Sequence, residues 1–67
     1  MKARNARYIQ AWTKALDVLG DPLKATQWMG TDNHALGEQT PISLLETDEG
    51  LQQVEAILGR IEHGIFS

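Results

Sequence analysis

The last third of the chain carries the strongest pattern of apolar and polar positions. Its apolar residues recur at spacings of three, four and three, which draws one stripe along a helix: Leu51, Val54, Leu58 and Ile61. Thr47 precedes the stripe as an N-cap residue, and Gly64 follows it as the C′ glycine just past the helix end. The pattern predicts a long C-terminal helix that ends at His63, about 20 Å in length at about 1.5 Å per residue.

A second helical face lies in the first part of the chain. Its apolar residues fall at i, i+4, i+7, i+8 and i+11: Tyr8, Trp12, Ala15, Leu16 and Leu19. Ile9 borders this face, and Gly20 ends the helix. We therefore expect a first helix from residue 3 or 5 to residue 19.

Between these two helices the same start signal, a polar N-cap residue followed by proline, occurs at two places. Asp21 and Pro22 open a short helix that runs to about Met29, because proline at the first helical position loses no hydrogen bond. Thr40 and Pro41 open a third, very short helix. Residues 30–40 are turn formers and predict a loop with room for one helical turn around residues 33–36. No segment alternates with the period of two that indicates a strand.

Length and composition restrict the fold to one small helical domain. The 67 residues form a single domain, 1–67, and an apolar fraction of 42% is typical of a folded protein. The absence of cysteine excludes disulfides and thiolate metal sites. No apolar run approaches a membrane span and no signal peptide is present, so we expect a cytoplasmic protein that does not contact a membrane. The expected fold is all-α, a small compact bundle of three to five helices with a long C-terminal helix.

The apolar positions of these helices define the expected core: Trp12, Leu16, Leu19, Trp28, Leu36, Leu44, Leu45, Val54, Leu58 and Ile61. One residue breaks the pattern, because Gly59 lies inside the C-terminal helix at a cost of about 1 kcal/mol relative to alanine. The structural interpretation, which we favour, is the close approach of another part of the backbone or of an aromatic ring, with Trp12 and Trp28 as candidates. The functional interpretation is the close approach of a partner protein.

The net charge of −3 is unevenly distributed. Residues 1–14 contain Lys2, Arg4, Arg7 and Lys14 and no acid, whereas residues 15–67 contain all nine acids. A basic segment can contact phosphates, but such charges are also common on a solvated helix face. Because the chain as a whole is acidic, we do not expect it to bind nucleic acid by itself.

No group of residues predicts catalysis or cofactor binding. His34 and His63 are the only histidines, and they lie on different elements without the spacing of a zinc-binding helix. The glycines do not form a phosphate-binding loop, and no nucleophile is paired with a base. We therefore expect a protein that is not an enzyme and that needs no metal ion or cofactor.

An ordered series of short motifs extends over residues 6–67. The motifs are Gly20-Asp21-Pro22, Ala25 and Trp28, Ala35-Leu36-Gly37, Thr40-Pro41 with Leu44-Leu45, Thr47-x-Glu49-Gly50, and Val54 followed by Leu58-Gly59-Arg60-Ile61-Glu62-His63-Gly64. This series resembles the toxin-binding domain of the Xre/MbcA/ParS antitoxins of bacterial type II toxin–antitoxin modules. The chain departs from the family at Glu38, where relatives often carry a second glycine. Family members also usually carry a DNA-binding helix-turn-helix domain ahead of this one, for which 67 residues leave no room.

The resemblance implies that the chain binds and neutralises a partner toxin, commonly of the RES class, which consumes NAD. In that family the C-terminal end of the antitoxin lies at or near the active-site cleft of the toxin. The residues expected to bind the partner are therefore Arg60, Glu62, His63, Gly64, Ile65, Phe66 and Ser67. The sequence points to the same end independently, because the apolar pair Ile65 and Phe66 beyond the helix stop needs a surface to cover it.

Two other classes of function stay open. The chain can be a homodimerising helical module whose apolar tail docks on a sister chain. It can also be an accessory DNA-binding domain that uses residues 2–14, in which case its affinity for duplex DNA would depend strongly on salt.

Overall fold

Polar side chains cap the N-termini of two helices at the positions that the sequence predicts, Asp21 and Thr47. The computed structural model describes residues 2–64. A carboxylate oxygen of Asp21 accepts a hydrogen bond from the backbone N–H of Leu23 at 2.8 Å, and Pro22 is the first residue of the helix that follows. The hydroxyl of Thr47 accepts from the N–H of Gly50 at 3.0 Å and begins the last helix. These bonds satisfy amide groups that a helix N-terminus leaves without an internal partner.

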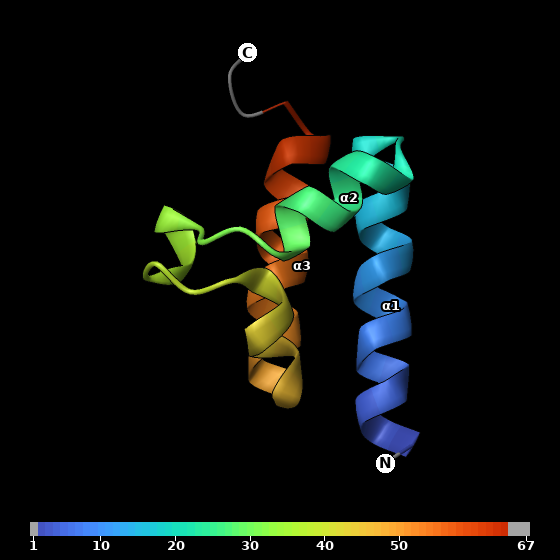
Figure 1. Cartoon of the computed structure of the whole chain (residues 1–67), viewed down its shortest axis with the longest axis vertical. Coiled ribbons are helices and arrows are strands. Elements are labelled where there is room, and N and C mark those ends of the chain that lie inside the picture. Colours follow the sequence, from blue (N-terminus) through green and yellow to red (C-terminus); the bar gives the residue numbers. More distant parts are fainter. Residues whose placement is uncertain (1, 65–67) are drawn as a thin grey trace.

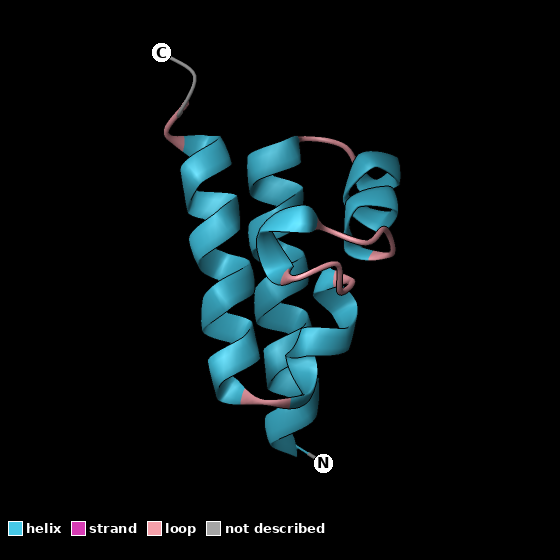
Figure 2. Ribbon diagram, turned by 90° about the vertical axis from the view of Figure 1, so that its left-hand side faces the viewer, coloured by secondary structure: helices cyan, strands magenta, loops and turns pink. Residues whose placement is uncertain are grey.

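Three α-helices and two short 3₁₀-helices follow one another in the described residues. They are α1 (Lys2–Leu19), α2 (Pro22–Met29), η1 (His34–Leu36), η2 (Pro41–Glu46) and α3 (Asp48–Glu62). Helices α1 and α3 lie side by side, and α2 packs against the C-terminal part of α1 and against η2 (Figures 1 and 2). Segment η2 runs back along α3, and η1 stands out to one side on its loop (Figure 1). The expected all-α bundle with a long C-terminal helix is confirmed.

Three alanines and six larger apolar side chains form the buried core of the described residues. Its buried apolar residues are Ala11, Ala15, Ala25, Met29, Leu36, Leu45, Leu51, Val54 and Leu58. Four of them, at positions 36, 45, 54 and 58, belong to the expected core. The alanines of α1 present no long side chain, so the neighbouring elements pack directly against this helix.

The largest side chains of the expected core lie at its edge instead. Half-buried positions are Trp12, Leu16, Leu19, Trp28, Leu44 and Ile61. The first five of these residues pack against the buried core as predicted, although none of them is fully buried, and Ile61 is not among the residues packed against it. A tryptophan in so small a bundle covers the rim of the core and keeps part of its ring in contact with solvent.

Two glycines of α3 have opposite surroundings. A Cβ atom added to Gly50 would overlap the carbonyl group of Leu44, so only glycine lets η2 approach the first turn of α3 this closely. A Cβ atom added to Gly59 would meet no atom of the described residues within 4 Å. The expectation that an aromatic ring packs on Gly59 is therefore wrong, because neither tryptophan reaches it. The approach of a partner to Gly59 stays a prediction.

No helix in the part of the chain that the structure describes has both the length and the apolar character needed to cross a membrane.

The two glycines supply a matched test of this packing. Gly50→Ala should lower the free energy of unfolding by about 1–3 kcal/mol, because the backbone of η2 must move away from the new methyl group. Gly59→Ala should raise it by about 0.5–1 kcal/mol, because alanine is the better helix former and finds open space. Urea unfolding followed by circular dichroism measures both values. A loss of stability in both variants would contradict the open surroundings of Gly59.

Candidate functional site

The last turn of α3 carries four of the residues expected to bind a partner. Arg60 and Glu62 lie within the turn, and His63 is its C-cap. The N–H of His63 donates to the carbonyl of Gly59 at 3.0 Å, and Gly64 takes a left-handed φ of 66° that ends the helix. The other three expected residues, 65–67, lie outside the described residues. The structure therefore describes only the part of the expected site that lies before residue 65.

Glu62 is held against the first helix. Its carboxylate accepts a hydrogen bond from the ammonium group of Lys14 at 2.8 Å, which joins the last turn of α3 to the second half of α1. This hydrogen bond, with the positive charge of Lys14, lowers the pKa of Glu62 below its ordinary value of 4.5. The same bond is the main cause that raises the pKa of Lys14. The carboxylate of Glu62 is therefore fixed beside Lys14, and its other oxygen can still accept a hydrogen bond from a partner.

Arg60 lies on a groove between α3 and the η1 loop. The groove has a volume of about 460 Å³ and is lined by Ala35, Leu36, Gly37, Gln39, Gln53, Ala56, Ile57 and Arg60. Arg60 is exposed and forms no hydrogen bond or ion pair within residues 2–64. Its five donors are thus available to a carboxylate or phosphate of a partner.

The loop that forms the other wall of this groove contains two left-handed residues in succession. Gly37 has φ 69°, and Glu38 has φ 66°, which is unusual for a residue other than glycine. This backbone explains why a glycine suits position 38 and why Glu38 departs from the family pattern. The Glu38 carboxylate lies 2.6 Å from Nδ1 of His34, so the exposed pair spans the η1 turn.

The basic groups of the first helix face acids of the same molecule. Arg4 lies 3.0 Å from the carboxylate of Glu46, and Arg7 lies 3.2 Å from that of Asp48. Lys14 is paired with Glu62 as described above. These pairs weaken the positive potential of the segment and argue against the accessory DNA-binding alternative.

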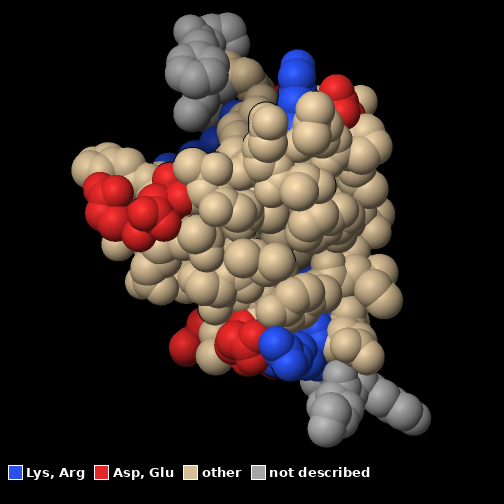
Figure 3. All heavy atoms as spheres, in the orientation of Figure 1, with Lys and Arg blue, Asp and Glu red and all other residues tan. Residues whose placement is uncertain are grey.

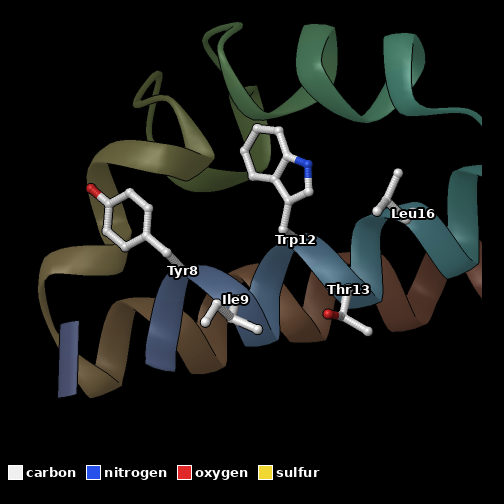
Figure 4. Close-up of a pocket in the computed structure, with 5 residues that line it drawn as sticks. All are labelled: Tyr8, Ile9, Trp12, Thr13 and Leu16. Carbon is white, nitrogen blue, oxygen red and sulfur yellow. The ribbon is translucent and has the colours of Figure 1, made fainter. Parts of the chain in front are cut away.

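A second surface, which the sequence analysis did not predict, lies on α1. We define the α1 groove by its five lining residues: Tyr8, Ile9, Trp12, Thr13 and Leu16. Figure 4 shows Ile9 and Thr13 on one side of the helix, with the Trp12 ring extending toward α2 and the η loops. The groove has a volume of about 440 Å³, and Ile9 is 66% exposed.

The sequence contains a signal for this surface in the width of the apolar arc of α1. The arc extends from Val18 through Ala11 to Ile9, which is about half of the helix circumference at about 100° per residue. The packed elements bury the alanine side of this arc fully, whereas Tyr8, Trp12 and Leu16 are half-buried against the core and Ile9 is exposed. The remaining side forms the α1 groove.

No group of three or more potential metal-ligating side chains occurs within residues 2–64.

Comparison with known proteins gives consistent matches. The family model described as the antitoxin Xre/MbcA/ParS C-terminal toxin-binding domain matches residues 14–64. Two curated proteins named "Antitoxin Xre", from Yersinia enterocolitica and Photorhabdus laumondii, are each 45% identical to this chain over 65 residues. Each alignment covers 96% of this chain and 44% of the relative. The chain therefore spans less than half the length of these relatives.

The pair that joins Lys14 to Glu62 predicts a measurable titration. In Lys14→Gln, the pKa of Glu62 should rise toward its ordinary value, because both the hydrogen bond and the positive charge are lost. A depressed carboxyl pKa stabilises the fold above pH 4.5, and this contribution disappears as the pH falls through the depressed value. NMR titration of the Glu62 side chain measures the shift, with Lys24→Gln as the control that leaves it unchanged. An unaltered Glu62 pKa in Lys14→Gln would contradict the pair.

Proposed function

This chain belongs to the family of Xre/MbcA/ParS C-terminal toxin-binding domains, and from this premise we propose that it binds and neutralises a cognate toxin of the NAD-consuming RES class. The observation that carries the proposal is the family match over residues 14–64, together with two relatives named as antitoxins. The family is a binding domain and is non-enzymatic, in agreement with the expectation from the sequence. The toxin class comes from the resemblance of the motifs.

We propose that the C-terminal end of the chain is the part that meets the toxin, at or near its active-site cleft. A cleft that holds an anionic dinucleotide should offer positive charges and hydrogen-bond donors. The terminal carboxylate would imitate the charge of such a ligand, and the apolar side chain of Phe66 would fill its space. Arg60 supports this arrangement because its guanidinium is exposed, has no partner among the described residues and lies in the last turn of α3.

Gly59 belongs to the same proposal. A glycine inside a helix costs about 1 kcal/mol, and no packing within the described residues repays it at this position. We propose that the backbone of the toxin approaches α3 at Gly59. The Gly59→Ala variant described above then serves a second purpose, because it should bind the toxin less well although its fold is more stable.

Substitution of Arg60 tests the proposed site against a control of equal charge. Arg60→Ala should weaken toxin binding by about 1.5–3 kcal/mol if the guanidinium pairs with a charged group of the toxin. Lys24→Ala removes one positive charge from α2, and Lys24 also forms no ion pair within residues 2–64, so this variant should bind normally. Isothermal titration calorimetry of the chain against a catalytically inactive toxin measures both. Equal affinity in the two variants would exclude Arg60 from the interface.

Truncation after Gly64 tests the tail. A chain ending at Gly64 should keep its circular dichroism spectrum and unfolding midpoint, because the helices and core described above end before residue 65. It should nonetheless lose much of its ability to restore growth to cells that express the toxin. Loss of the fold would mean that the tail is part of the core. Full rescue by a folded truncated chain would mean that inhibition uses another face.

A further inference from the structure

Hydrogen bonds within the η1 loop hold it in a fixed shape beside α3. The N–H of Asn33 donates to the carbonyl of Gln39 at 3.0 Å, and the N–H of Glu38 donates to the carbonyl of Asn33 at 3.0 Å. The buried side chain of Leu36 anchors the loop on the core of the bundle. The groove between this loop and α3 is therefore formed before any partner binds, and a partner does not have to order it.

We call this groove, whose lining residues are given above, the Arg60 groove. Five of its lining residues are apolar or glycine, and three carry polar side chains: Gln39, Gln53 and Arg60. All three polar residues are exposed, and none of their side chains forms a hydrogen bond or ion pair within residues 2–64. A mainly apolar groove with a few free polar groups has the composition of a binding site.

From this arrangement we propose that the Arg60 groove binds a short extended segment of the toxin that carries an aspartate or glutamate side chain. The inference rests on the proposed function, because it takes the toxin as the partner. It adds the kind of segment that the toxin presents. It also adds a contact surface beyond the C-terminal end, since Arg60 is the one residue that the two share.

The charge of the groove selects an acidic side chain. Arg60 is the one charged residue among the described residues that line it. Figure 3 shows acidic side chains on the η1 side of the molecule. The acids of the η1 loop, Asp32 and Glu38, do not line the groove, and the Glu38 carboxylate lies 2.6 Å from Nδ1 of His34. A guanidinium without a partner pairs best with a planar group through two hydrogen bonds, and a carboxylate supplies them.

The two glutamines favour a peptide segment over a small anion. Each side-chain amide offers both donors and an acceptor, which match the N–H and C=O groups of an extended backbone. Gln53 and Arg60 lie seven positions apart on α3, which is about 10 Å at about 1.5 Å per residue. An extended chain rises about 3.3 Å per residue, so about three residues cover this length. A small anion would pair with Arg60 alone and would leave both amides unused.

The sign of a charge introduced at Gln53 tests the inference. Gln53→Glu should raise the Kd of the complex with a catalytically inactive toxin by about tenfold, because it repels an acidic segment, and Gln53→Lys should lower it by about threefold. The matched control is Gln27, an exposed glutamine of α2 that lies outside the groove and whose side chain forms no hydrogen bond within residues 2–64. Gln27→Glu and Gln27→Lys should bind as the wild type does. Isothermal titration calorimetry measures all four variants.

A second measurement locates the contact without any substitution. When unlabelled toxin is added to the isotopically labelled chain, the side-chain amide NMR signals of Gln39 and Gln53 should shift, and that of Gln27 should stay in place. Circular dichroism of the four variants should match that of the wild type, because both substituted positions are exposed.

Three outcomes would count against the inference in different ways. Normal binding by both Gln53 variants, with unshifted Gln39 and Gln53 signals, would exclude the groove from the interface while the toxin-binding function stands. Tighter binding by Gln53→Glu than by Gln53→Lys would show that the occupant is basic. Failure of the wild-type chain to bind the toxin at all would overturn the proposed function, and this inference with it.

Discussion

The side chain of Arg7 joins α1 to the junction of η2 and α3, which lies 38 to 41 positions further along the chain. Its Nε donates to the carbonyl of Leu45 at 2.7 Å, and Nη2 donates to the carbonyl of Glu46 at 2.7 Å. Nη1 lies 3.2 Å from the carboxylate of Asp48 at the start of α3. The last carbonyls of a short helix have no internal partner, and a guanidinium with its fork of donors can satisfy two at once. Helix α1 is thereby fixed to the point where η2 ends and α3 begins.

The direction of α3 follows from this junction. Gly50 brings the first turn of α3 against the carbonyl of Leu44, so η2 and α3 can separate only at the cost of buried contacts. At the other end of α3, the ion pair between Lys14 and Glu62 joins the last turn to α1. The helix is thus held near both ends, and the backbone that carries Arg60 is positioned before any partner binds. A site on such a support loses little conformational entropy on binding.

The sequence by itself determined the local structure. The caps Asp21, Thr40 and Thr47 and the starts of the helices after them were predicted correctly, because each depends on bonds between residues two to four positions apart. It also predicted a toxin-binding site at the C-terminal end, which stays a prediction; of its residues, positions 60, 62, 63 and 64 lie among the described residues. Tertiary structure alone decided which side of the apolar arc of α1 is buried and which acids Arg4, Arg7 and Lys14 meet. It also left Gly59 open. These outcomes depend on contacts such as that of Arg7 with Leu45, 38 positions apart, and no periodic pattern within one helix specifies them.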